Sequence, residues 1–246
     1  GGSNTAVGYQ AGNFTTTASN STFIGRRAGY ANTTGAGNTG IGGEAGLSLT
    51  TSSYNTALGF RALKLTTTAS NNTAVGTFAL QANTTGASNV AVGGYSLLSN
   101  TTAPRNTAVG YQSLYANTTG DNNTAIGEGS GKSNTTGHNN SFLGQDAGEA
   151  NTTGQYNVAV GSDALQANTI SNNNTAVGFQ ALYSMTGTGT TASNTAVGYF
   201  AGKGHTTGYN NVYFGNEAGN YGTAHTTGLG GTYLGAYAGA SAANAN

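Results

Sequence analysis

Residues 106–127 read NTAVGYQSLYANTTGDNNTAIG, so the element Asn-Thr-Ala-Val-Gly returns as Asn-Thr-Ala-Ile-Gly after 17 residues. Variants of this element recur along nearly all of the 246 residues, in steps of 17 except for 178 to 198 and 215 to 235, which are 20. We predict that the repeated glycine turns the chain with a positive φ angle. The 14 turn glycines are Gly8, Gly25, Gly42, Gly59, Gly76, Gly93, Gly110, Gly127, Gly144, Gly161, Gly178, Gly198, Gly215 and Gly235.

This repeat is too short for a pair of helices, and its Thr, Val, Asn and Gly residues favour short strands and turns. We therefore predict an all-β fold, a β-solenoid (β-roll) of about 14 coils with a 17-residue repeat. Two short strands are expected in each coil: the Thr-Ala-Val segment and a segment around the Ala or Ser three residues after the glycine. Residues 1–246 then form a single repeat domain of 14 units, with three-residue insertions near 184–192 and 220–227.

The residue directly before the repeat glycine is apolar in every unit, which predicts a core column. Its members are Val7, Ile24, Ile41, Leu58, Val75, Val92, Val109, Ile126, Leu143, Val160, Val177, Val197, Phe214 and Leu234.

A neighbouring pair of columns exchanges volume. The residue two before the glycine is usually Ala but is bulky at Phe23, Phe142, Tyr213 and Tyr233, and each of those units has Gly four residues after the repeat glycine, where six other units have Leu. Close packing penalises both voids and overfilling, so we predict that these two columns share one space.

Both faces of the Thr-Ala-Val strand are therefore predicted to be buried, because neighbouring side chains of a strand point to opposite faces. A single small coil has only one interior, so the second face needs a partner. We predict that the partner is another copy of the chain, and a trimer is the favoured homo-oligomer.

Asparagine opens 12 of the 14 units. Stacked in successive coils, these amides are predicted to form a hydrogen-bonded ladder.

Composition excludes several classes of protein. The formal net charge is zero and 6% of residues are charged, so nothing indicates a nucleic-acid partner. There is no cysteine for a disulfide or thiolate metal site. No apolar run is long enough to span a bilayer. Acidic residues are scattered over different repeat positions, so we expect no enzyme, no cofactor and no metal.

The stretch GEGSGKS at 127–133 resembles a phosphate-binding loop, but the first glycine of that motif would fall on Ile126. Its glycines are instead predicted to belong to the repeat. His205 and His225 each replace the first Asn of the polar turn Asn-Thr-Thr-Gly, and we expect them to be solvent-exposed substitutions, because a metal site needs more ligands.

A column of threonines follows that turn Asn. Its members are Thr16, Thr33, Thr50, Thr67, Thr84, Thr101, Thr118, Thr135 and Thr152. We favour a structural role, in which the hydroxyl groups satisfy the backbone. The alternative is an ice-binding face. Variable outward positions follow the glycine, and they could bind a carbohydrate through aromatic faces or could equally form a lateral packing surface. They are Tyr9, Arg26, Phe60, Phe78, Tyr95, Tyr111, Phe179 and Tyr199.

The segments NTAVG at 4–8 and 106–110, NTAIG at 123–127 and NVAVG at 157–161 resemble the repeated strand in the heads of trimeric autotransporter adhesins. The 17-residue array is also similar to repeats of phage tail fibres and bacterial surface proteins. These resemblances imply a stacked β-roll, assembly of three chains, and a place on the surface of a cell or virion.

We therefore expect a non-enzymatic extracellular structural fibre, filament subunit or adhesin shaft that associates with itself through solenoid faces. An ice-binding solenoid and a carbohydrate-binding receptor tip remain the alternatives, the latter with a surface glycan or host receptor as partner. The last unit runs into SAANAN without an evident polar cap. This indicates either a segment of a longer fibre or a subunit that stacks end to end into a polymer.

Overall fold

One three-residue strand forms in every repeat. The computed structural model describes residues 2–187, 189, 191–220 and 227–239, and it consists of two units, Gly1–Asn122 and Asn123–Asn246. None of the described residues lies in a helix.

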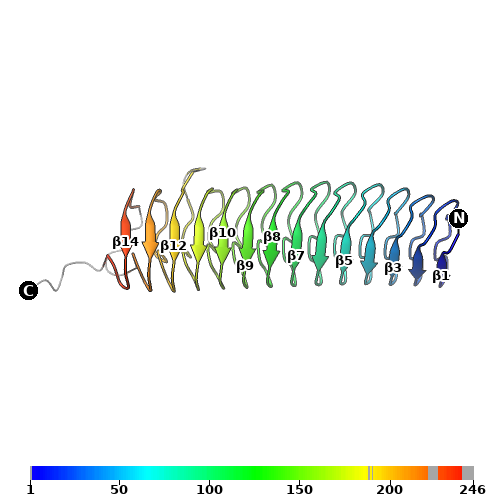
Figure 1. Ribbon diagram of the computed structural model, residues 1–246, viewed down its shortest axis with the longest axis horizontal. Helices are drawn as coiled ribbons and strands as arrows, with labels where there is room; N and C mark the ends of the chain where they lie inside the picture. The colour runs from blue at the N-terminus through cyan, green and yellow to red at the C-terminus, as the bar shows by residue number, and fades with distance from the viewer. Residues whose placement is uncertain (1, 188, 190, 221–226, 240–246) are drawn as a thin grey trace, which may run out of the picture. The chain divides into compact units, whose positions relative to one another are not determined.

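The first unit contains seven parallel strands that lie side by side in chain order (Figure 1). They are β1 (Thr5–Val7), β2 (Thr22–Ile24), β3 (Thr39–Ile41), β4 (Thr56–Leu58), β5 (Thr73–Val75), β6 (Val90–Val92) and β7 (Thr107–Val109). Each strand residue pairs with the residue at the same repeat position of the next strand, as Val7 does with Ile24. The repeat period therefore sets the register.

The second unit has the same construction. Its seven strands are β8 (Thr124–Ile126), β9 (Ser141–Leu143), β10 (Val158–Val160), β11 (Thr175–Val177), β12 (Thr195–Val197), β13 (Val212–Phe214) and β14 (Thr232–Leu234). Their pairing is parallel and in the repeat register, including β11 with β12 across the first three-residue insertion. That insertion lies in the polar return, where Asn172 and Thr191 form an isolated parallel bridge. Residues 221–226 of the second insertion lie outside the described residues.

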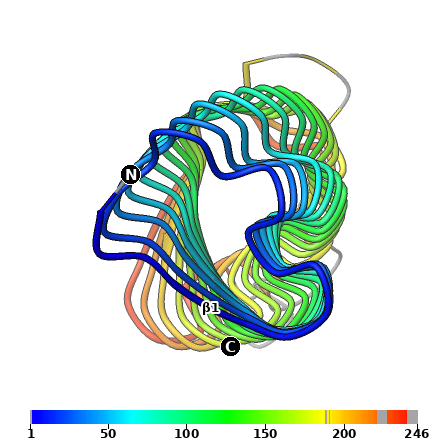
Figure 2. The ribbon, with the colours of Figure 1, turned by 90° about the vertical axis from the view of Figure 1, so that its right-hand side faces the viewer.

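Hydrogen bonds continue from coil to coil outside the strands. The Gly29 N–H donates to the carbonyl of Ala45, and the Gly148 N–H to that of Ala164, both at 2.9 Å. Figure 2 shows that successive coils within a unit follow similar paths. The predicted all-β solenoid with a 17-residue repeat is confirmed.

The predicted role of the turn glycines is also confirmed. All 14 have φ between +115° and +140°, a region that side chains disfavour. A β-carbon on Gly59 would lie 2.6 Å from the carbonyl oxygen of Gly76 in the next coil. Successive corners therefore approach too closely for any other residue.

The second strand predicted in each coil is wrong. The residues two and four after the repeat glycine have positive φ in every coil, for example Arg61 at 58° and Leu63 at 50°. Ala62 lies between these two left-handed residues, so the backbone turns there instead of extending. Each coil consequently has one strand, closed by a tight turn.

The interior of the coil is lined by small residues and a few large ones. The middle residue of each strand points inward, and so do the Ala or Ser three residues after the glycine and the Leu at the fourth position. Phe142, Tyr213 and Leu63 are fully buried in these columns, as are Ala57 and Ala62.

The predicted core column, in contrast, lies on the wrong side of the strand. Because neighbouring side chains alternate, burial of the middle residue turns the residue before the glycine outward. Seven members are exposed: Val7, Ile24, Leu58, Ile126, Leu143, Phe214 and Leu234. The other seven are half-buried: Ile41, Val75, Val92, Val109, Val160, Val177 and Val197.

The exchange of volume inside the coil is confirmed. A β-carbon on Gly148 would lie 2.6 Å from the ring of Phe142, and one on Gly239 would lie 2.7 Å from that of Tyr233. In six of the nine coils with Ala at mid-strand, Leu occupies this space.

Candidate functional site

The outer strand face is the surface made by the first and third residues of each strand. The first residue is mostly Thr, and the third is always a large apolar residue. In the first unit Leu58 is 42% exposed, and in the second unit Ile126 is 42% exposed. An apolar column at a fixed repeat position thus runs along the outer strand face of each unit.

The predicted asparagine ladder lies buried behind that face. The Asn72 N–H donates to Asn55 Oδ1 at 3.0 Å, and the Asn89 N–H to Asn72 Oδ1 at 2.9 Å. Asn89 Nδ2 donates in turn to the Ala103 carbonyl at 2.9 Å. The same bonds recur in the second unit, for example from the Asn157 N–H to Asn140 Oδ1 at 2.9 Å. The predicted ladder is confirmed.

A second buried ladder is made by the first Asn of the polar turn. Asn100 Nδ2 donates to Asn83 Oδ1 at 2.9 Å, and Asn151 Nδ2 donates to Asn134 Oδ1 at 2.7 Å. All four residues are buried, so this column belongs to the interior and not to a surface turn.

The threonine column bonds to backbone. Thr33 Oγ1 donates to the Thr50 carbonyl at 3.0 Å, and Thr135 Oγ1 to the Thr152 carbonyl at 3.0 Å. The bonds from Thr16, Thr50, Thr67, Thr84, Thr101 and Thr152 to the next coil are equivalent. This geometry supports the structural role for the column, because the hydroxyl protons are used within the solenoid.

The stretch 127–133 forms an ordinary corner of the repeat. Gly127, Gly129 and Gly131 take the positive φ angles of the repeat positions that they occupy. Ser130 is buried, and its hydroxyl donates to the Phe142 carbonyl at 2.9 Å. These residues close a coil and have no helix after them to complete a phosphate-binding loop.

The corner band is the surface formed by the residues one, two and five positions after each repeat glycine. In the first unit it begins with a basic zone, consisting of Arg26, Arg27, Arg61 and Lys64 around the single carboxylate of Glu44. Arg26, Arg61 and Lys64 contact that carboxylate at 2.7, 2.9 and 3.3 Å. Burial disfavours the ionised form of Glu44, but hydrogen bonds from Lys64 and Arg61 outweigh it and lower the pKa of the carboxyl group.

The corner band of the second unit begins with an acidic zone, consisting of Glu128, Asp146, Glu149 and Asp163, with Lys132 beside them. Within the described part of this unit, none of the four carboxylates forms an ion pair. Burial raises the pKa of Asp146, and the neighbouring charges of Glu149, Asp163 and Glu128 raise it further. With four carboxylates and one lysine, the zone carries a net negative charge.

An aromatic zone follows in each unit. In the first, Phe60, Phe78, Tyr95 and Tyr111 form a continuous row with ring centroids 5.5, 5.1 and 5.8 Å apart. The second contains Phe179, Tyr199 and Phe200, with Phe179 and Tyr199 stacked at 5.7 Å. Lys203 Nζ lies 3.9 Å from the centroid of the Phe200 ring. Tyr111 and Tyr199 are about half exposed, so both rows are accessible.

The prediction that His205 is exposed is wrong. The residue replaces a buried turn Asn, is 1% exposed, and its Nδ1 lies 2.9 Å from the Tyr213 hydroxyl. Burial, and then the neighbouring Tyr233, raise the pKa of Tyr213. His225 lies outside the described residues. In the part of the chain that the structure describes, no group of three or more His, Asp or Glu could hold a metal ion.

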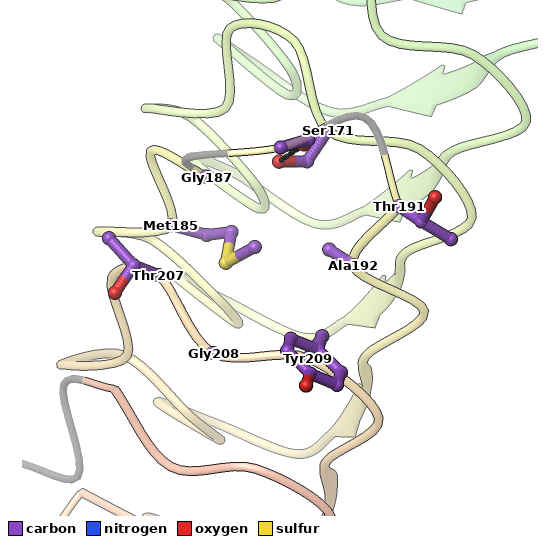
Figure 3. A pocket seen from close by; sticks show the side chains of 9 residues that line it. Ser171, Met185, Gly187, Thr191, Ala192, Thr207, Gly208 and Tyr209 are labelled. Atoms are coloured by element: carbon purple, nitrogen blue, oxygen red, sulfur yellow. Dashed lines mark hydrogen bonds between the residues drawn. The ribbon is translucent and has the colours of Figure 1, made fainter.

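A half-open cavity of about 340 Å³ lies in the second unit where the first insertion interrupts the turn-Asn ladder (Figure 3). Met185 takes the place of an Asn there. The lining residues are Ser171, Met185, Gly187, Gly189, Thr191, Ala192, Thr207, Gly208 and Tyr209. Tyr209 is the sole titratable side chain among these nine residues.

Among the described residues there is no helix long and apolar enough to cross a membrane. Comparisons with protein-family models, with curated proteins and with solved structures each find no match to the chain.

Proposed function

We propose that the protein is a non-enzymatic extracellular structural protein, acting as a fibre, filament subunit or adhesin shaft. Copies associate through the outer strand face, and a trimer is the favoured assembly. The observation that carries this proposal is the outward apolar column at the third strand position, whose members are exposed or half-buried in every coil of each unit. A contiguous apolar surface of this kind usually marks an interaction site.

The interior supports the same role. Ladders of buried Asn and half-buried Thr bond each coil to the next. Such bonds stiffen a solenoid along its stacking direction, which suits a structural element under tension. The chemistry of the strand face is repetitive, and a repetitive surface suits packing against an identical copy.

Replacing Ile24 and Leu58 with Asp tests the proposal. These changes place charge on the outer strand face and leave the interior intact. We expect sedimentation velocity to show a stable oligomer for the original chain and monomer for Ile24→Asp/Leu58→Asp. The matched control is Thr34→Asp/Thr68→Asp, which adds equal charge at exposed turn positions and should leave the oligomer unchanged. A monomeric original chain would refute the proposal.

A further inference from the structure

The corner band has the same order of zones in both units, a charged zone followed by an aromatic zone, but the charge is opposite. The basic zone spans the coils of β2 to β4, and the acidic zone spans those of β8 to β10. The aromatic zones centre on the coils of β5 and β6 and on those of β11 and β12. The charged zones of the two units thus have opposite net charge, although Glu44 in the coil of β3 and Asp146 in the coil of β9 are both acidic at the same repeat position.

We propose that the corner band of the first unit in one copy binds the corner band of the second unit in another copy. The two bands run parallel, with the coil of β2 in one copy opposite the coil of β8 in the other, which is a shift of six coils in the repeat order. Basic zone then meets acidic zone, and aromatic zone meets aromatic zone. This inference rests on the proposed function and adds a second contact, distinct from the outer strand face.

Positions within the repeat support this shift. Arg26 and Glu128 occupy the same place in the coils of β2 and β8, one residue after the glycine. Arg61 and Asp163 occupy the same place in the coils of β4 and β10, two residues after it. The insertions fall after β11, so every coil in both charged zones has the regular 17 residues and the spacing matches.

The charges are available for such a contact. Arg26 and Arg61 retain 57% and 35% of their side-chain exposure although both touch Glu44. A single carboxylate leaves the basic zone with excess positive charge. The acidic zone has the opposite excess, and its Glu149 and Asp163 receive amide hydrogen bonds from Gln166 and Gln180. Complementary potentials of this kind steer association and set its register.

An unshifted contact between two corner bands is disfavoured. It would place the basic zone of one copy against that of the other, and the acidic zones likewise, and like charges in an interface are repulsive. The shifted contact joins two different surfaces, so each copy keeps one charged zone free for a further copy. Such a heterologous contact propagates unless it closes into a ring.

Two charge-reversed variants test the proposal. The first, Arg26→Glu/Glu44→Lys/Arg61→Glu/Lys64→Glu, inverts the basic zone while it preserves a central ion-pair network. The second, Glu128→Lys/Glu149→Lys/Asp163→Lys, surrounds Asp146 with cations and thereby imitates the native basic zone. We expect each variant alone to raise the apparent Kd of shifted association about tenfold or more. An equimolar mixture should regain the original affinity, because each variant then supplies the charge that the other needs.

The matched control is Arg105→Glu/Asp121→Arg, which reverses an exposed ion pair at 3.1 Å outside the corner band. It should associate like the original chain. Sedimentation velocity measures association, and circular dichroism shows whether each variant folds. If a variant does not fold, the salt dependence of the original chain still tests the proposal. Added salt should screen the charged contact and weaken association of the original chain about tenfold.

Three results would each overturn the shifted contact. The folded variants could associate with unchanged affinity, their mixture could fail to regain the original affinity, or the association of the original chain could be insensitive to salt. If neither salt nor the charge-reversed substitutions change the oligomer but Ile24→Asp/Leu58→Asp dissociates it, the shifted contact is wrong and the proposed function stands. A chain that is monomeric at every salt concentration would refute the proposed function as well.

Discussion

Phe142 and Gly148 share one space inside the coil of β9. A β-carbon on Gly148 would lie 2.6 Å from the Phe142 ring, whereas six of the nine coils with Ala at mid-strand have Leu at the position of Gly148. A bulky mid-strand residue therefore requires Gly four residues after the repeat glycine, and Leu at that position occurs only with Ala at mid-strand.

The first prediction follows from this shared space. Gly148→Leu should destabilise the protein by about 1–3 kcal/mol through overpacking, and Phe142→Ala by about 3–5 kcal/mol through the cavity that it leaves. The double variant should come close to the original stability, because it recreates the Ala–Leu pair of six other coils. Denaturation of all four proteins measures this coupling. Simple addition of the two single losses would contradict it.

Gly93 and the adjacent Gly94 provide a second prediction. Gly93 has a φ of +128°, and its β-carbon would lie 2.7 Å from the carbonyl carbon of Gly110. A β-carbon on Gly94 would meet Tyr111 at an ordinary 3.6 Å. We expect Gly93→Ala to cost at least about 1–3 kcal/mol from backbone conformation alone. Gly94→Ala should be nearly neutral, and equal melting temperatures for the two variants would disprove this account.

A third prediction concerns Asn89, which accepts from the Asn106 N–H and donates to the Ala103 carbonyl. Asn89→Leu removes both bonds within the interior. The Ala103 carbonyl still accepts from Asn100 Nδ2 at 3.0 Å. Only the buried Asn106 N–H loses its acceptor, so we expect a loss of about 1–3 kcal/mol. Thermal unfolding measures it. As the control, Thr85→Leu changes an exposed turn residue and should have little effect.

The fourth prediction concerns pH. The pKa of Glu44 is lowered, so its stabilising effect is full above the unfolded pKa and is lost as pH falls through the folded value. The pKa of Asp146 is raised, so its ionisation destabilises the fold and protonation in mild acid relieves that cost. The two effects oppose each other, and we expect the melting temperature to differ little between mild acid and neutral pH.

Single substitutions should separate these two effects. Asp146→Asn should raise the melting temperature at neutral pH more than in mild acid, and Glu44→Gln should lower it at neutral pH. A large pH shift in the original chain, or a loss of stability in Asp146→Asn at neutral pH, would be inconsistent with the opposing carboxyl groups.

The sequence predicted the period, the turn glycines and the Asn ladder because each repeats at a fixed position and has one physical cause. It misplaced Val7 and Leu58 because the columns on both faces of the strand are apolar, and greater hydrophobicity suggested the interior. The narrow coil instead selects the smaller Ala. The bulky exceptions at Phe23 and Phe142, each matched by a glycine, were the signal that identified the true interior.

His205 was misplaced for a related reason. Asn is common in surface turns, so its column resembled a polar exterior, yet the amides satisfy each other within the interior. A residue that replaces Asn in that column, such as His205, is therefore buried like the Asn residues of the neighbouring coils. The zones of the corner band become visible only when charged and aromatic residues are sorted by repeat position, because the members of one zone lie about 17 residues apart.

The strand-side Asn ladder and the threonine column each have hydrogen bonds that run in one direction along the chain. Asn55 Oδ1 accepts from the coil that follows it, and Thr33 Oγ1 donates to the coil that follows it. A newly synthesised coil therefore lacks these bonds until its successor has emerged and folded. Within each unit, maturation should advance in single-coil steps from the N-terminal side, always leaving one immature coil at the growing front.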